Sequence, residues 1–230
     1  MKKAIFIERD GILNEVRRET KNPISPLTLE EFKVKSDAES ALRDLKAAGF
    51  VLIVTTNQPG LSRGCQSRRE LDRMHDLLRQ QFPVDDLMVC PHDESDYCPC
   101  RRPRPGLLIE AAFKWQLNLE YSFVISDKWQ DAEAARTAGC TSLLLSSPWV
   151  GRAHPDFVLP GLDQIVAKIL ALKRPAGLVS SAMPLTFPGL NGRENLNNPV
   201  QLAADSRNDP SGRKSLQFRP IDRPGASKAA

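Results

Sequence analysis

The sequence lacks a long apolar run. None of its apolar stretches reaches the ~20 residues that a helix needs to span a bilayer. The N-terminus also lacks the apolar core of a signal peptide, because its two lysines are followed by a short apolar stretch, Ala4 to Ile7, that is better explained as a first strand. We therefore expect a cytoplasmic protein with no membrane partner. A chain of 230 residues, 41% of them hydrophobic, suits one folded domain with a sizeable core.

Most of the sequence also lacks an excess of one charge. The net charge is +4, but residues 1–173 contain 24 of the 32 lysines and arginines and 24 of the 28 acidic residues. The whole positive excess therefore falls in residues 174–230. Because nucleic-acid-binding proteins usually carry a basic patch on their fold, this distribution argues against a nucleic-acid partner.

The end of the sequence lacks the residues of a core. Residues 175–230 contain seven prolines and no cysteine, tryptophan or tyrosine. Such a segment buries too little apolar surface to offset the entropy lost on ordering. We expect a folded domain over residues 1–173 and a disordered basic tail over residues 174–230, with a short docking motif at residues 215–224 as the less favoured alternative for part of the tail.

Before the tail, the sequence alternates between strand and helix patterns. Apolar, β-branched runs predict buried strands, and capped segments with apolar residues at helical spacing predict helices. The expected strands cover residues 4–8, 50–56, 85–90, 121–127 and 141–147, and the expected helices cover 36–49, 67–82, 106–117, 130–139 and 162–173. The first of these helices reads as capped by Ser36, with Glu39 three residues later. This alternation predicts an α/β fold with a doubly wound, mostly parallel sheet that has helices on both faces.

An acidic pair follows the first expected strand. The stretch "AIFIERDG" places Glu8 and Asp10 two residues apart, so that their carboxylates point to the same side of an extended chain. They lie where a strand ends, and open α/β sheets place their active sites there. This pair is suited to hold a metal ion and to take part in catalysis.

Two more strand ends carry polar side chains. "VTTNQPG" supplies Thr56, Asn57 and Gln58, whose hydroxyl and amide groups can bind phosphate oxygens, and "ISDKWQD" supplies Asp127 and Lys128, with Asp131 one helical turn later. Any one such end could simply cap a helix. Three of them together predict a converging site.

Three of the five cysteines cluster with a histidine in "CPHDESDYCPC". Cys90, His92, Cys98 and Cys100 are two close pairs that can close a tetrahedral Cys₃His site. The alternative is a loop of reduced thiols that binds no metal, because cytosolic chains rarely form disulfides. Four soft ligands in eleven residues favour Zn²⁺. A closed site of four protein ligands leaves no place for water, so this zinc is expected to be structural.

A run of arginines follows the cysteine loop directly. "RRPRPG" contains Arg101, Arg102 and Arg104. Guanidinium groups bind phosphate oxygens in a bidentate way, so the run predicts an anion site. The alternative is a solvated basic turn, and the position beside a rigid loop favours phosphate.

The four motifs together resemble a known family. "ERDG", "TTNQPG", "RRPRPG" and "SDKWQD" are similar, in order and spacing, to the four motifs of the haloacid dehalogenase superfamily. The cysteine loop narrows the resemblance to its capless, zinc-loop phosphatases, which include enzymes for heptose bisphosphate and for histidinol phosphate. "TNQPGLSRG" and "CRRPRPGLL" are more similar to the heptose branch. The resemblance covers residues 3 to about 172.

The resemblance implies an activity and a role for each motif. It implies a Mg²⁺-dependent phosphatase for a small phosphorylated sugar, first the 7-phosphate of D-glycero-D-manno-heptose 1,7-bisphosphate and alternatively histidinol phosphate. Apart from the resemblance, we expect a monomer. By the same resemblance, Glu8 would be the nucleophile and Asp10 the general acid and base. Mg²⁺ would be held by Glu8, the Asp10 carbonyl and Asp127. The phosphate and substrate ligands implied are Thr56, Asn57, Gln58, Arg101, Arg102 and Lys128.

The sequence departs from the family pattern at the nucleophile. The family has aspartate where this chain has Glu8, threonine where it has Ile12, lysine where it has Arg102 and glycine where it has Ser126. One extra methylene moves a carboxylate by ~1.5 Å, and a displacement of ~1 Å can cost about a hundredfold in rate. Two hypotheses follow: a phosphatase adapted to glutamate, and a catalytically impaired protein that binds phosphate ligands or partners.

Overall fold

The computed structural model describes residues 1–17, 23–151 and 153–172. The tail predicted for residues 174–230 lies outside the described residues.

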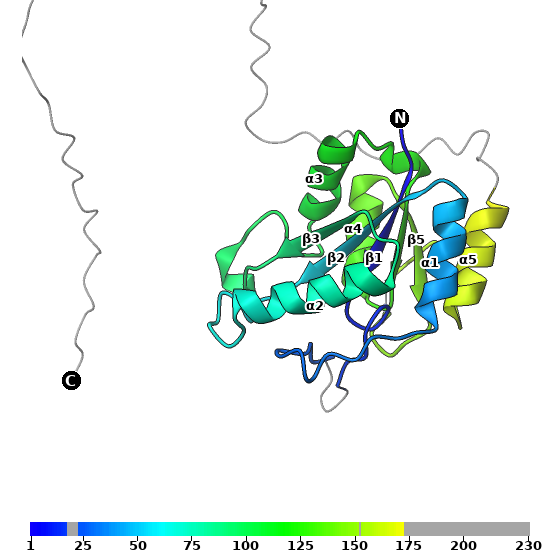
Figure 1. Ribbon diagram of the computed structural model, residues 1–230. Coiled ribbons are helices and arrows are strands. Elements are labelled where there is room, and N and C mark those ends of the chain that lie inside the picture. Colours follow the sequence, from blue (N-terminus) through cyan, green and yellow to red (C-terminus); the bar gives the residue numbers. More distant parts are fainter. Residues whose placement is uncertain (18–22, 152, 173–230) are drawn as a thin grey trace, which may run out of the picture. The chain divides into compact units, whose positions relative to one another are not determined.

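The core of the fold is a parallel sheet of six strands (Figure 1). The strand order is β3-β2-β1-β4-β5-β6, and each neighbouring pair is parallel. The strands are β1 (Ala4–Glu8), β2 (Val51–Asn57), β3 (Asp86–Cys90), β4 (Phe123–Ser126), β5 (Thr141–Leu145) and β6 (Phe157–Leu159). The predicted α/β class with a parallel sheet is confirmed.

Five α-helices cover the sheet on its two faces (Figure 1). They are α1 (Ala38–Ala47), α2 (Arg68–Gln81), α3 (Gly106–Trp115), α4 (Trp129–Ala138) and α5 (Leu162–Ala171). Two 3₁₀ turns, Glu94–Asp96 and Leu119–Tyr121, complete the regular structure of the described residues.

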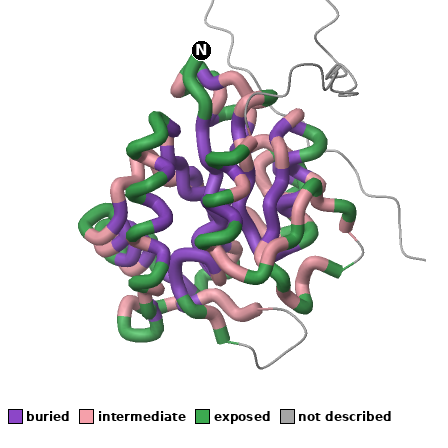
Figure 2. The backbone as a smooth tube through the Cα atoms, turned by 90° about the vertical axis from the view of Figure 1, so that its right-hand side faces the viewer, coloured by how far each residue is buried: buried purple, intermediate pink, exposed green. Residues whose placement is uncertain are grey.

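The central strand shows why both faces are covered. Ile5 and Ile7 of β1 belong to a buried cluster with apolar side chains of α1, α2 and α5. Ala4 and Phe6 point the other way, into a second cluster with side chains of α3 and α4. Because side chains alternate along a strand, a continuously apolar run requires a covering layer on each side. Figure 2 shows the result, with buried backbone inside and the exposed stretches outside it.

One local prediction was wrong, and one element was missed. The helix expected from Ser36 begins at Ala38, and its N-cap, Asp37, makes no side-chain capping bond, so the expected Ser36 cap does not form. The edge strand β6 was missed, because three residues beside a proline and a glycine give no alternation that a sequence pattern can detect.

The connection from β1 to α1 carries no inserted domain in its described part. Between Glu8 and Ala38, the described residues form turns and isolated bridges, such as Asp10 with Asn14 and Asn14 with Val34. The absence of a cap domain predicted from the resemblance holds for these residues. Among the described helices, none combines the length and the apolar character that crossing a membrane requires.

Candidate active site

The carboxyl ends of β1, β2 and β4 bring the predicted residues together. β1 lies between β2 and β4, and Glu8 ends β1 opposite Thr55. Asn57 ends β2, and Asp127 follows directly after β4. Parallel strands place all their carboxyl ends at one edge of the sheet, so polar residues distant in sequence become neighbours.

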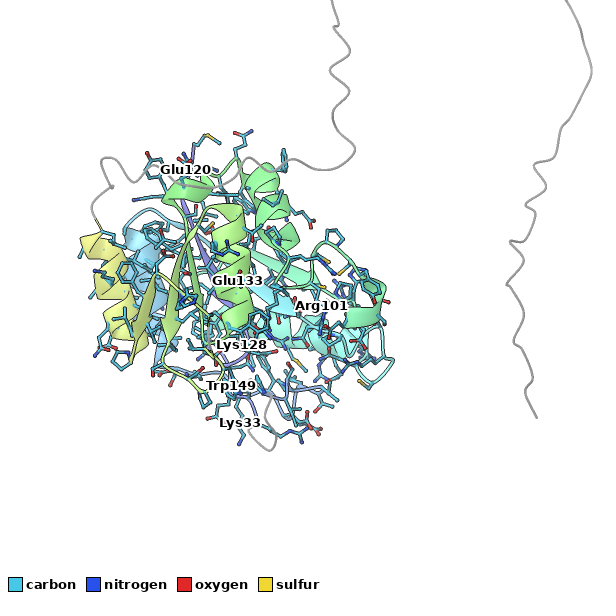
Figure 3. The ribbon with its side chains drawn as sticks, turned by 180° about the vertical axis from the view of Figure 1, so that it is seen from behind. Lys33, Arg101, Glu120, Lys128, Glu133 and Trp149 are labelled. Atoms are coloured by element: carbon cyan, nitrogen blue, oxygen red, sulfur yellow. The ribbon has the colours of Figure 1, made fainter. Side chains whose placement is uncertain are left out.

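Three oxygen atoms that could act as metal ligands lie around the ammonium group of Lys128. The ammonium of Lys128 contacts the backbone carbonyl of Asp10, and it lies 2.5 Å from Asp127 Oδ1 and 4.0 Å from Glu8 Oε1. Figure 3 shows Lys128 at the N-terminal end of α4. Two carboxylates and one carbonyl are the oxygen ligands that Mg²⁺ prefers. The donor set therefore fits Mg²⁺, which would take the position of the ammonium.

Lys128 is buried at this point, and burial changes its pKa. Removal from water lowers the pKa of Lys128, and the nearby charge of Arg102 lowers it further, while Asp127 and Asp131 oppose the shift. The carboxylates around Lys128 thus offset part of the cost of burying its charge.

A close backbone approach holds the donors together. Gly11 has φ +99°, and a Cβ on it would lie 2.5 Å from Asp127 Oδ2. Only glycine combines this conformation with this space. The glycine of "ERDG" thus lets the turn after β1 pack against the Asp127 carboxylate.

Glu8 reaches Arg102. The Arg102 Nη1 group donates to Glu8 Oε2 and lies 3.4 Å from Asp131 Oδ1, while Glu8 Oε1 accepts a 3.4 Å bond from the backbone N–H of Asp10. The parallel register of β1 and β2 continues through Glu8 and Thr55. The extra methylene is accommodated by an ion pair with the arginine.

Asp10 is held from both sides. Arg9 donates from Nε and Nη2 to the two carboxylate oxygens at 2.9 and 3.1 Å, and Gln58 Nε2 donates to Oδ2 at 2.9 Å. Burial alone would raise the pKa of Asp10, but the charge of Arg9, hydrogen bonds from Ser25 and Asn14 and the charge of Lys128 together outweigh it, so the pKa lies below the usual value. The carboxylate is therefore fixed in orientation and stabilised in its ionised form.

The residues predicted to bind phosphate differ in what they face. The Gln58 amide, 1% exposed, also donates to Thr56 Oγ1 at 2.9 Å, so it orients two site residues. Asn57, Arg101 and Arg102 line a cavity of about 570 Å³ together with Asp10 and Lys128.

The arginine behind Asp10 was missed by sequence analysis. Arg9 is fully buried, its Nη1 lies 3.3 Å from His75 Nε2, and its guanidinium packs over the Phe32 ring. Burial and the Arg9 charge lower the pKa of His75 to about 3, so the histidine stays neutral at physiological pH. His75 and Arg9 together brace Asp10.

A signal for His75 was present in its helix. α2 buries Leu71, Met74 and Leu78, and His75 lies on the same face, one helical turn after Leu71. The general polarity of this helix concealed that face.

Asp131 also belongs to the site. Ser126 Oγ donates to Asp131 Oδ2 at 2.5 Å and accepts from the backbone N–H of Lys128 at 3.1 Å. The serine that replaces the family's glycine therefore anchors the carboxylate that faces Arg102. In the sequence, the signal for Asp131 was its position four residues after Asp127, about one helical turn later.

The cysteine loop forms the predicted cluster. The ligand atoms of Cys90, His92, Cys98 and Cys100 all lie within 4.8 Å of one another. Neighbouring atoms are 3.3–3.7 Å apart, for example 3.7 Å between the sulfurs of Cys90 and Cys98. A tetrahedral Zn²⁺ site separates two sulfurs by about 3.8 Å and a sulfur from a nitrogen by about 3.5 Å. The cluster is compatible with zinc.

The cysteine loop also places the arginines. Arg104 donates to the Cys98 carbonyl at 2.7 Å, Arg101 donates to the His92 carbonyl at 3.2 Å, and Arg102 extends to Glu8. The three arginines predicted as one anion site are thus divided between loop structure and the cavity. A metal that fixes the loop would fix Arg102 as well.

The sheet order and the acidic strand ends define a parallel α/β protein of the haloacid dehalogenase type. A HAD-hydrolase-like family model matches residues 99–165. A D-glycero-beta-D-manno-heptose-1,7-bisphosphate 7-phosphatase of Helicobacter pylori strain J99 is 32% identical over 149 residues, which cover 62% of this chain and 82% of that protein. The corresponding protein of Pasteurella multocida is 29% identical over 189 residues, 75% of this chain and all of that one.

A solved structure agrees with the sequence relatives. The D,D-heptose 1,7-bisphosphate phosphatase of B. bronchiseptica, complexed with magnesium and phosphate, is 27% identical with a TM-score of 0.64, over 73% of this chain and 98% of that one. The chain belongs to the haloacid dehalogenase-like hydrolases, and within them it resembles the D,D-heptose 1,7-bisphosphate phosphatases.

Removal of one thiol tests the metal cluster. Cys98→Ser should reduce zinc from about one ion per chain to below about a tenth, because the site loses one of its four ligands. Elemental analysis of protein purified without chelator measures this, and Cys65→Ser, outside the cluster, is the control. Absence of zinc from the unmodified protein would contradict the prediction.

Substitutions at two glycines of similar backbone conformation distinguish the cost of backbone strain from the cost of steric overlap. Gly11→Ala and Gly49→Ala both place a side chain at positive φ, but nothing lies within 4 Å of a Cβ at Gly49. We expect about 1 kcal/mol of destabilisation at Gly49, and about 1–3 kcal/mol more at Gly11 from the overlap with Asp127. Denaturant unfolding measures both, and equal losses would mean that the overlap is relieved.

The buried histidine predicts acid sensitivity. Its pKa is near 3 in the folded chain and about 6.5 when unfolded, so the unfolded state binds the proton first and stability is lost as pH falls below about 6.5. At pH 5 the loss is about 2 kcal/mol. His75→Gln keeps an acceptor for Arg9 and should lose about 2 kcal/mol less than the unmodified protein between pH 7 and pH 5. Parallel pH profiles of the two proteins would contradict this.

Proposed function

We propose that this chain is a Mg²⁺-dependent phosphatase for a small phosphomonoester. The observation that carries the proposal is the convergence of Glu8, the Asp10 carbonyl and Asp127 on one cationic point beside Arg102. Phosphoryl transfer needs positioning and charge stabilisation above all, and this site supplies both. When bound there, Mg²⁺ would offset the negative charge of the transferring phosphoryl group.

The side chains divide the reaction between them. A Glu8 carboxylate oxygen attacks phosphorus and forms an acyl phosphate, while the bond from phosphorus to the ester oxygen breaks. In the substrate complex, where the negative charge of the phosphate favours the protonated form of Asp10, Asp10 gives its proton to the leaving oxygen. It then takes a proton from the water that attacks phosphorus and releases inorganic phosphate. Arg102 and Thr56 hold the phosphoryl oxygens, Lys128, displaced by Mg²⁺, contributes charge balance, and Arg101 faces the rest of the substrate.

The relatives indicate a first substrate. The 7-phosphate of D-glycero-D-manno-heptose 1,7-bisphosphate is our first choice, since the heptose enzymes match most of the chain. Histidinol phosphate is the alternative from the neighbouring branch of the family.

A second function has one observation in its favour. The carboxylate of Glu8 is already paired with Arg102, and an ion-paired carboxylate is a poorer nucleophile. A protein with this pair kept closed would bind phosphate ligands without turning them over. The pair also lies where an incoming phosphate would compete for the arginine, so substrate binding itself can release Glu8.

Three changes at one position decide between the two functions. Phosphate release with Mg²⁺ should be measured for heptose 1,7-bisphosphate, histidinol phosphate and an aryl phosphate. If Glu8 is the nucleophile, Glu8→Ala and the isosteric Glu8→Gln should each lower kcat at least a thousandfold. Glu8→Asp tests whether the site prefers the shorter side chain.

The outcomes are distinct. Turnover that survives Glu8→Ala and Glu8→Gln would remove Glu8 from the nucleophile role. No turnover in the unmodified protein together with turnover in Glu8→Asp would favour the binding function, and phosphate affinity measured by calorimetry would then quantify it.

A further inference from the structure

Two of the three tryptophans of the chain line the active-site cavity. Trp129 begins α4 directly after Lys128, and Trp149 lies in the loop that follows β5. Figure 3 shows Trp149 beyond Lys128 at the N-terminal end of α4. Trp129 remains 41% exposed. An indole that stays partly exposed beside the candidate active site offers an apolar surface that a ligand can cover.

Hydrogen bonds fix the backbone at both tryptophans. The backbone N–H of Trp129 donates to the carbonyl of Trp149 at 3.0 Å. The backbone N–H of Trp149 donates to Ser147 Oγ at 3.1 Å, and the same hydroxyl donates to the Asp127 carbonyl at 2.5 Å. The loop is therefore tied to the residue that offers a ligand to the metal. Such preorganisation reduces the entropy lost when a ligand binds.

Apart from three prolines and a glycine, the rest of the cavity lining is polar. Arg101, Asn57, Gln130 and Glu94 line it and offer donors and acceptors. The hydrogen bond of Arg101 goes to a backbone carbonyl, and its positive charge also lies near Asp93. The cavity thus combines aromatic surface with hydroxyl- and anion-binding groups, and it adjoins the point where phosphoryl transfer is proposed.

This combination matches a pyranose ring. The C–H groups on one face of a sugar ring stack on aromatic rings, while its hydroxyls need hydrogen-bond partners around the edge. A linear polyol phosphate has the same hydroxyls but presents no rigid apolar face. An aromatic leaving group can stack too, but it would leave most of the polar groups of the cavity without a partner.

We infer that Trp129 and Trp149 form an aromatic platform that binds the pyranose ring of a cyclic sugar phosphate and selects it against linear phosphate esters. The inference rests on the proposed function, because it assigns the leaving group of that same site. Both tryptophans act as specificity-determining residues, and the phosphoryl group is held by other side chains.

A matched pair of probes tests the platform. Glucose 6-phosphate is mostly a pyranose, and glucitol 6-phosphate is its linear counterpart. Affinity of the full chain for each, and for inorganic phosphate and histidinol phosphate, should be measured by calorimetry with Mg²⁺. Trp129→Ala and Trp149→Ala should each weaken binding of the cyclic ester at least tenfold. They should change binding of the linear ester and of inorganic phosphate less than twofold.

Conservative variants and a third tryptophan supply the controls. Trp129→Phe and Trp149→Phe keep an aromatic face and should restore affinity for the cyclic ester to within about threefold. Trp115 lies on α3, where its indole N–H donates to Asp86 at 2.7 Å. Trp115→Phe should leave all four affinities unchanged. If binding of the cyclic ester quenches tryptophan fluorescence, Trp115→Phe should leave that quenching unchanged, because the platform indoles remain.

The outcomes separate this inference from the proposed function. Equal affinity of the unmodified chain for the cyclic and linear esters, or equal weakening of both by the alanine variants, overturns the platform while phosphate binding stands. Tighter binding of histidinol phosphate than of the cyclic ester, lost with either tryptophan, overturns the choice of a sugar. Failure to bind any ester or inorganic phosphate, together with no phosphate release, overturns the proposed function and the platform with it.

Discussion

The close packing of the turn after β1 against Asp127 is the constraint on which the site depends. A Cβ at Gly11 would lie 2.5 Å from the Asp127 carboxylate, so any other residue would push the two strand ends apart. The same approach brings the Asp10 carbonyl and Asp127 Oδ1 to one ammonium. Because β1 and β4 are neighbours in the sheet, this local fit aligns oxygen donors that are more than a hundred residues apart in sequence. The loop after β5 is tied to the same residue, since Ser147 Oγ donates to the Asp127 carbonyl at 2.5 Å.

The arginine of the cysteine loop links the second half of the site to the first. Cys90 ends β3, and Cys98 and Cys100 lie shortly before α3. The ligand cluster therefore joins the end of β3 to the start of α3. Arg102 leaves this cluster and reaches Glu8 in the central strand. A zinc ion would therefore act on catalysis only through position, by fixing a guanidinium. The glutamate makes that position more important, since its longer side chain already extends to the arginine.

Much of the fold was predictable, because its signals are local. The apolar runs of β1, β2 and β4 require burial on both faces, and alternation with helices leaves a parallel sheet as the simplest arrangement. Glu8, Asp10 and Asp127 lie close together, since strand ends of a parallel sheet share one edge. The Ser36 cap and β6 were wrong or missed for the opposite reason. A cap depends on one backbone turn, and a three-residue edge strand depends on its neighbour β5, so neither has a reliable pattern of its own.

The sequence by itself determined the fold class, the metal-ligand spacing of the cysteine loop and the identity of the acidic strand ends, because periodicity and spacing are properties of the chain. Only the tertiary structure decided what each side chain faces. It placed Arg9 and His75 behind Asp10, turned Gln58 from the cavity to its neighbours, and set two tryptophans beside the site. These contacts join β1 to α2 and α4 to the loop after β5. They depend on packing between distant segments, which no local pattern records.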